Sequence, residues 1–72
     1  MPRKPEPTLA NGVRDLRAHS GMTQQELADQ VGVTRQTIVA LEGEAYTPSL
    51  ALALRVAQVF DKPVDKVFWF ER

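Results

Sequence analysis

The side chains best suited to specific binding chemistry in this sequence fall on one face of a short predicted helix. At about 100° per residue, one side of that helix spans about 140° and carries Arg35, Gln36, Val39, Ala40 and Gly43. Ordinary solvated helix faces are rich in Lys and Glu instead. Arginine can bond both acceptors of guanine, glutamine can pair with adenine, and small apolar groups contact the thymine methyl. The face therefore suits the reading of base edges, whereas the alternative is that Arg35 and Gln36 are ordinary exposed helix residues.

The sequence contains no comparable cluster of residues suited to catalysis or metal binding. The chain has 72 residues, one histidine (His19) and no cysteine. It contains no glycine-rich phosphate loop and no carboxylate pair with a plausible pocket. We therefore expect no enzymatic activity, no metal site and no cofactor.

The base-reading face requires two helices joined by a tight turn. Thr23 and Glu26 have the spacing of a capping box, which begins a helix. Gly32 can adopt the left-handed conformation that ends one. Thr34 is a good N-cap for a second helix, and apolar residues recur at helical spacing in both segments. Helix, glycine turn and helix make a helix-turn-helix unit, whose second helix enters the DNA major groove.

The segment Thr23–Glu42, TQQELADQVGVTRQTIVALE, resembles the Xre and phage-repressor family of helix-turn-helix regulators. The family pattern is T-Q-x-E-L-A-x-x-x-G-V-[ST]-x-x-x-[IV]-x-x-[LIW]-E. The similarity continues through Pro48-Ser49-Leu50 and Val56-Ala57 and covers roughly residues 12–70. The resemblance implies an all-α fold, a compact five-helix, lambda-repressor-like DNA-binding domain.

The resemblance also implies which residues contact DNA. Base contacts are expected from Arg35, Gln36 and Ala40. Phosphate contacts are expected from Gln24, Thr34, Thr37, Arg14 and Arg17. Two alternatives stay open, because Thr37 could line the core instead, and Arg14 and Arg17 could simply be solvated.

Two features depart from what such proteins usually show. Nine basic residues balance nine acidic ones, so the net charge is zero, whereas DNA-binding domains usually carry a basic surface. Relatives commonly carry Glu-Asn-Gly-Lys where this chain has Glu42-Gly43-Glu44-Ala45. Phosphate contacts after the second helix of the motif are therefore in doubt, and weak nonspecific attraction to DNA is expected.

The remaining segments predict a single domain. Residues 1–8 are expected to form a flexible arm, residues 9–70 the DNA-binding domain and residues 71–72 a tail. The first helix is expected from near Leu9 or Asn11 to His19, and one further helical turn or two from Val64 to Phe68. The fourth helix is expected after Ser49, with these residues facing the core: Leu50, Ala53, Val56, Ala57 and Phe60.

The end of the chain predicts a homodimer. Val67, Phe68, Trp69 and Phe70 are four large apolar residues in succession, and a small domain cannot bury all of them. The expected dimer interface consists of Leu52, Val59, Phe68, Trp69 and Phe70. The alternative is that the tail folds back and is buried within one monomer.

The function expected from these features is sequence-specific transcriptional regulation in the cytoplasm. The pattern favours a repressor that binds double-stranded DNA at a palindromic operator as a homodimer. Neither a membrane-spanning stretch nor a signal-peptide pattern is present. The alternative keeps the fold but makes the chain an antitoxin-like or adaptor protein whose main partner is another protein.

Overall fold

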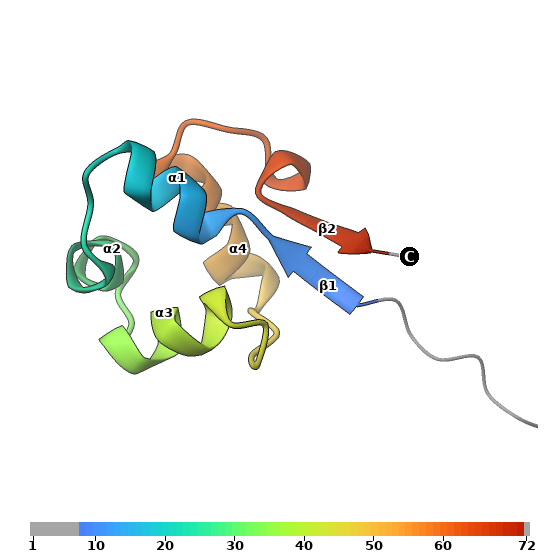
Figure 1. Cartoon of the computed structure of the whole chain (residues 1–72), viewed down its shortest axis with the longest axis horizontal. Helices are drawn as coiled ribbons and strands as arrows, with labels where there is room; N and C mark the ends of the chain where they lie inside the picture. Colours follow the sequence, from blue (N-terminus) through green and yellow to red (C-terminus); the bar gives the residue numbers. More distant parts are fainter. Residues whose placement is uncertain (1–7, 72) are drawn as a thin grey trace, which may run out of the picture.

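Helices occupy the middle of the chain and two short strands its ends. The computed structural model describes residues 8–71. Its elements are β1 (Thr8–Asn11), α1 (Val13–His19), α2 (Gln24–Val31), α3 (Arg35–Glu42), α4 (Leu50–Val59), a 3₁₀ turn η1 (Val64–Lys66) and β2 (Phe68–Glu71). The helices gather on one side, and β1 and β2 lie side by side beyond them (Figure 1).

Local capping chemistry sets the ends of α2 and α3 as the sequence predicts. The Thr23 side chain accepts from the Glu26 amide at 3.0 Å, and Glu26 accepts from the Thr23 amide at 2.9 Å, which completes the capping box. Gly32 ends α2 with φ at 77°, in the left-handed region. Thr34 then caps α3 by accepting from the Thr37 amide at 3.3 Å.

The expectation of an all-α, five-helix domain is wrong at both ends of the chain. Thr8–Asn11, expected to end the arm and begin the first helix, forms β1 and pairs antiparallel with Phe68–Glu71. The fifth helix is only the three-residue turn η1, and Glu71, assigned to the tail, belongs to β2. The rest of the predicted arm, residues 1–7, and Arg72 lie outside the described residues.

Asn11 explains why α1 starts later than expected. Its side-chain oxygen accepts from the Val13 amide at 3.1 Å, an Asx-type turn just before Gly12, the N-cap of α1. Its side-chain nitrogen donates to the Leu41 carbonyl at 2.9 Å. One side chain therefore connects β1, the start of α1 and the last turn of α3.

The core lies between the helices and is closed by the end of the chain. Leu27, Val31, Ile38, Leu41 and Val56 are at most 2% exposed. Val13 from α1 and Val67, the residue before β2, are also fully buried in this core. The two apolar faces predicted for α2 and α3 are therefore confirmed.

The phase predicted for α4 is partly wrong. Ala53, Val56 and Ala57 are buried as expected, but Leu50 is 72% exposed and Leu52 only 2% exposed. Because α4 is apolar on almost every side, its periodicity does not determine which side is buried; packing against α2 does. Val59 is half-buried and packs against the core. Leu52 is therefore buried within the monomer, contrary to its predicted place in a dimer interface.

The apolar end of the chain divides between the core and the surface. Val67 is fully buried and Phe68 is 8% exposed, so neither lies on the surface as the dimer hypothesis required of Phe68. Trp69 and Phe70 are exposed. The alternative of a buried tail therefore holds for Val67 and Phe68, and that of an exposed tail holds for Trp69 and Phe70.

Helices α1 to α4, within residues 8–71, are all too short to cross a membrane.

Backbone strain at the end of α3 gives a testable consequence. Glu44 adopts φ of 62°, which costs a residue with a side chain about 1–2 kcal/mol relative to glycine. We expect Glu44→Gly to raise the free energy of unfolding by about 1 kcal/mol in urea titrations followed by circular dichroism.

The matched variant is Gly32→Ala, at φ of 77° with no atom within 4 Å of an added Cβ. Without a clash, backbone strain alone should lower the free energy of unfolding by about 1 kcal/mol. Equal stability of both variants and the unaltered chain would contradict this account of the two turns.

Candidate nucleic-acid interface

The turn between α2 and α3 fixes the direction in which α3 faces. The amides of Gly32 and Val33 both donate to the Ala28 carbonyl, at 2.9 and 3.1 Å. Ile38 and Leu41 are then buried against α2, so the opposite side of α3 faces solvent. This is the side with the residue types suited to base edges.

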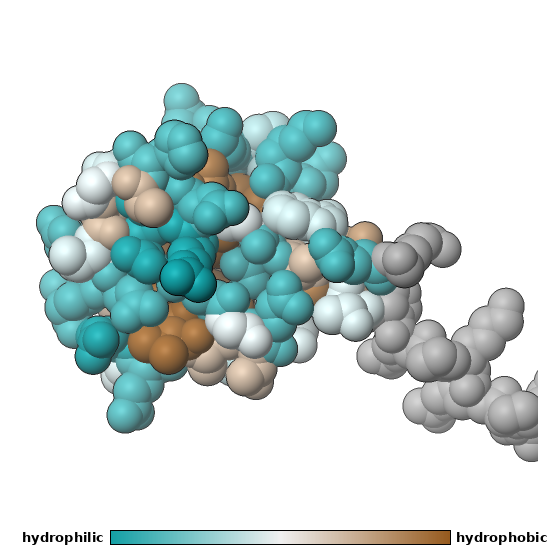
Figure 2. All heavy atoms as spheres, in the orientation of Figure 1, coloured by the Kyte–Doolittle hydropathy of each residue, from teal (hydrophilic) through white to brown (hydrophobic). Residues whose placement is uncertain are grey.

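The exposed side of α3 is open and unoccupied by other side chains. Arg35 and Gln36 are exposed in its first turn, Val39 is 45% exposed and Ala40 is half-buried. Figure 2 shows a small hydrophobic area over α3 within a mainly hydrophilic surface. Among residues 8–71, no hydrogen bond or ion pair engages the Arg35 or Gln36 side chain. Both side chains are therefore available to an external ligand.

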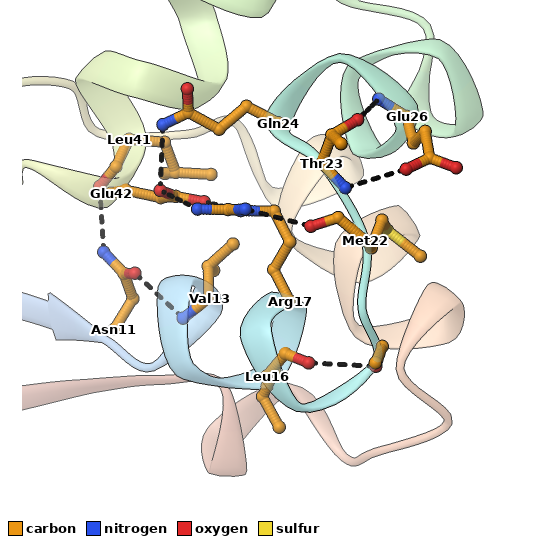
Figure 3. Close-up of polar contacts among 11 residues, drawn as sticks. Asn11, Val13, Leu16, Arg17, Met22, Thr23, Gln24, Glu26, Leu41 and Glu42 are labelled. Atoms are coloured by element: carbon orange, nitrogen blue, oxygen red, sulfur yellow. Dashed lines mark hydrogen bonds and ion pairs between the residues drawn. The ribbon is translucent and has the colours of Figure 1, made fainter.

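A carboxylate at the end of α3 connects it to α1 and α2 (Figure 3). Arg17 donates to both oxygens of Glu42, from Nε at 2.7 Å and Nη2 at 3.1 Å. A third Arg17 nitrogen, Nη1, donates to the Met22 carbonyl at 2.9 Å. Gln24, at the first position of α2, donates to Glu42 Oε1 at 3.2 Å. Glu42 therefore holds the last turn of α3 against α1 and the start of α2.

The ionisation of Glu42 reflects these partners. Burial raises the pKa of the Glu42 carboxyl, but hydrogen bonds from Arg17 and Gln24 and the positive charges of Arg17 and Arg14 outweigh it. The net result is a pKa below the ordinary value for glutamate. The hydrogen bond to Glu42 raises the pKa of Arg17 against the opposing effect of burial. Glu42 and Arg17 are thus a charged pair.

An open groove of about 630 Å³ separates the start of α2 from α3 and reaches α1. It is lined by Arg14, Arg17, Gly21, Met22, Thr23, Gln24, Gln25, Arg35, Val39, Glu42 and Gly43. Three arginines face one carboxylate there, and that carboxylate is already paired with Arg17. A chain with no net charge therefore has a locally basic groove beside the exposed side of α3, which can act within a Debye length.

The starts of α2 and α3 offer further polar groups. The amides of Gln24 and Gln25 precede the first hydrogen bond within α2, where backbone N–H groups favour an anion. The hydroxyls of Thr34 and Thr37 lie 3.0 Å apart and share a hydrogen bond. Thr37 is only half-buried, so it does not belong to the core.

The structure separates the predicted DNA-contact residues into two groups. Arg14, Arg17, Gln24 and Arg35 line the groove together. Gln36, Ala40, Thr34 and Thr37 lie on α3 and its N-cap outside that lining. Arg17 is not freely solvated, because each of its three side-chain nitrogens donates one hydrogen bond within the protein, and its contact with a phosphate stays a prediction.

Sequence reasoning missed the roles of Glu42 and Asn11. The sequence did carry a signal for Glu42. An acidic residue in the last turn of a helix interacts unfavourably with the helix dipole and needs a cation nearby. No comparable signal marks Asn11. Its partner Leu41 is 30 positions away along the chain.

The segment after α3 differs chemically from the pattern Glu-Asn-Gly-Lys. Glu44 is exposed, and the Ala45 amide donates to the Ala40 carbonyl at 2.9 Å. That amide ends the helix, so it is not free for an anion, and the only charge added here is negative.

Comparison with known proteins assigns the class that this geometry indicates. The helix-turn-helix family model matches residues 13–67, which is most of the chain. The chain belongs to the helix-turn-helix family of the Xre/Cro/C1 type, and it is a DNA-binding transcriptional regulator.

Relatives and solved structures agree with this assignment. The chain is similar to YgzD of Bacillus subtilis, an uncharacterized HTH-type transcriptional regulator, with 46% identity over 63 residues that cover 88% of this chain and 96% of the relative. An uncharacterized HTH-type regulator of Archaeoglobus fulgidus is 51% identical over 59 residues, 82% of this chain and 84% of the relative. The restriction-modification controller protein C.AhdI of Aeromonas hydrophila superposes with a TM-score of 0.70 and 28% identity, covering 75% of this chain and 82% of that chain.

The Glu42 pair predicts a stability change that depends on pH. Glu42→Gln leaves Arg17 without its counter-charge and should lower the free energy of unfolding by about 2 kcal/mol at pH 7. The stabilisation by the carboxylate is complete above the unfolded pKa of about 4.3 and is lost as the pH falls through the lower folded pKa. The difference between the variant and the unaltered chain should therefore narrow below pH 4.

Urea unfolding at pH 7 and at pH 3 measures this difference. The control is Glu44→Gln, which removes the same charge from an exposed side chain and should change stability by less than about 0.5 kcal/mol. An equal loss for Glu42→Gln at both pH values would contradict the role given to the ionised carboxylate.

Proposed function

We propose that this regulator is a repressor that binds a palindromic operator as a homodimer, with α3 in the major groove. The observation that carries the proposal is the position of Arg35. This residue belongs both to the exposed side of α3 and to the basic groove beside it. One surface can therefore meet base edges and the phosphates next to them.

The proposed base contacts follow from residue chemistry and from position on α3. Arg35 would donate two hydrogen bonds to guanine, and Gln36 would donate to and accept from adenine. Both residues lie in the first turn of α3, which recognition helices turn towards the bases. Ala40, one turn further along, would contact a thymine methyl group.

The proposed phosphate contacts surround the groove. Arg14 is exposed at the edge of the groove. The backbone N–H groups at the start of α2 would attract the same phosphate as Arg14. Gln24 keeps its side-chain oxygen for other partners but shares its nitrogen with Glu42. The hydroxyls of Thr34 and Thr37 extend the polar margin along α3. Arg17 would act through Glu42, by holding α3 at a fixed angle to α2.

Homodimer formation and a palindromic operator complete the proposal. A single α3 reads few base pairs, and two copies related by a two-fold axis read two half-sites about 34 Å apart. Occupation of an operator is sufficient for repression, because it excludes other proteins from the same DNA. No catalytic step is proposed, and the site of action is the cytoplasmic compartment that holds the DNA.

A second candidate function is supported by exposed apolar residues on α4. Leu50 is 72% exposed and Leu54 45% exposed one turn later, and Tyr46 nearby in the chain is 42% exposed. These residues are suited to a protein partner, as in an antitoxin-like or adaptor protein. Purification from the source cell distinguishes the two functions, since a partner recovered at one-to-one stoichiometry that Leu54→Ser releases supports the second.

Arg35→Ala tests the reading of bases. Loss of a bidentate guanine contact should weaken specific binding by about 1–3 kcal/mol and relax the preference at one base pair in each half-site. Because the side chain is exposed and has no partner within residues 8–71, the fold should be unchanged. Operator sequences selected from a random DNA pool, followed by binding titrations, measure both effects.

Two controls separate the charge of Arg35 from its geometry. Lys62→Ala removes a positive charge outside the groove and should leave affinity and site preference nearly unchanged. Arg35→Lys keeps the charge and should lose base preference more than affinity. An unchanged site preference for Arg35→Ala would remove this residue from the proposed readout.

Salt dependence tests the small number of phosphate contacts. Each contact contributes about 0.9 to the slope of log affinity against log salt concentration. With few cations on this face and Arg17 paired, we expect a shallower slope than a strongly basic domain gives. A slope that requires ten or more contacts per dimer, measured from 50 to 300 mM salt, would contradict this charge distribution.

A further inference from the structure

Val39 is an exposed apolar residue on the side of α3 that faces solvent. Its side chain is 45% exposed, and among residues 8–71 the apolar residues that pack against the core do not include it. Valine is also a weaker helix former than alanine, lysine or glutamine, which usually occupy exposed helix positions. Neither core packing nor helix propensity therefore explains a valine at this position.

Arg35, Val39 and Gly43 form one line along this side of α3. They are spaced four residues apart, so they follow one another on one helix face, and all three line the groove beside α2. The backbone does not require a glycine at position 43, because φ of −83° is open to every residue and an added Cβ would meet only backbone oxygens, at 3.4 Å or more. The missing side chain leaves Val39 uncovered between Arg35 and the end of the helix.

Val39 lies where the base-reading side of α3 meets the groove proposed to hold phosphate. In the major groove, C5 of a pyrimidine is at the outer edge of the base, near the backbone of its own strand. With α3 against the base edges and a phosphate between Arg14 and the start of α2, Val39 would lie next to this carbon. Two valine methyl groups can exclude water from a base methyl group, but they cannot replace the water that hydrates a polar edge.

We infer that Val39 determines specificity by packing against the 5-methyl group of a pyrimidine next to the guanine read by Arg35. Residues one turn apart are separated by about 6 Å along the helix axis, and neighbouring bases by about 3.4 Å. The long Arg35 side chain and the short Val39 side chain can therefore reach adjacent base pairs. Thymine supplies the methyl group in unmodified DNA, and 5-methylcytosine supplies it in methylated DNA. A site with cytosine at this position would then bind more tightly once that cytosine is methylated.

This inference rests on the proposed reading of bases by α3 and adds one residue and one ligand group to it. Sites are first selected from an unmodified random DNA pool, which should return thymine beside the guanine whose preference Arg35→Ala relaxes. Uracil in place of that thymine removes only the methyl group. The replacement in one half-site should weaken binding by the unaltered chain about fourfold, the effect of one methyl group leaving an apolar contact.

Val39→Ala assigns the contact to this side chain. The variant should bind the thymine and uracil duplexes with nearly equal affinity, because the valine methyl groups that touch the base are gone. Its circular dichroism should be unchanged and its urea unfolding no easier, since the side chain is exposed. The control is Lys62→Ala, outside the groove, which should keep the fourfold difference between the two duplexes.

Methylated DNA tests the second source of the methyl group. Two further duplexes carry cytosine or 5-methylcytosine at the same position, opposite guanine. The unaltered chain should bind the 5-methylcytosine duplex about fourfold more tightly than the cytosine duplex. Val39→Ala should bind both with nearly equal affinity.

The outcomes separate this inference from the function on which it rests. A pool that yields no preferred sequence would refute the proposed reading of bases itself. A preferred site in which uracil beside the Arg35 guanine has no effect, or has the same effect on Val39→Ala, would overturn the role of Val39 alone. A response to thymine without a response to 5-methylcytosine would overturn the part that concerns methylated DNA.

Discussion

The carboxylate of Glu42 is the constraint on which the orientation of α3, and so of the proposed DNA-reading surface, depends. It accepts hydrogen bonds from Arg17 on α1 and Gln24 on α2, while its own backbone belongs to the last turn of α3. Ile38 and Leu41 hold the same helix by apolar contact, which is strong but has little directionality. Charge-assisted hydrogen bonds are directional, so they fix the angle of α3 about its contact with α2. The paired carboxylate also leaves Arg14 and Arg35 as the uncompensated charges of the groove.

The helix-turn-helix itself was predictable because its determinants are local. Thr23 and Glu26 are three residues apart, and Gly32 needs only its own backbone to end α2. The faces of α2 and α3 follow from a few apolar residues at helical spacing, which also predicts that Arg35 and Gln36 are exposed. The groove was not predictable from spacing, since it depends on how α1 approaches α3. Whether these residues bind bases and phosphates stays a prediction.

The parts that sequence reasoning got wrong depend on contacts between distant segments. Leu9 and Asn11 look like the start of a helix until their strand partners, Phe70 and Phe68, are known. Helix α4 carries leucine on two opposite sides, so its sequence does not distinguish Leu50 from Leu52. Helix α4 packs against α2, and Leu52 lies on the buried side of α4 while Leu50 lies on the exposed side. Local signals set the helix ends, and tertiary packing decides which sides of weakly patterned segments are buried.

The pairing of Thr8 with Glu71 joins the two ends of the described chain, so the small sheet acts as a clasp that closes a loop of chain. Closing a loop of about 60 residues costs roughly 3–4 kcal/mol of chain entropy. Disulfides often offset that cost in small domains, but this chain has no cysteine, and main-chain hydrogen bonds between the two ends, such as the one from the Gly12 amide to the Val67 carbonyl, do so instead. We therefore expect the helices, with their local contacts, to fold first, and the sheet to form last and to open first. Opening of this clasp exposes the aromatic end of the chain to its surroundings while the buried contacts between α2 and α3 persist.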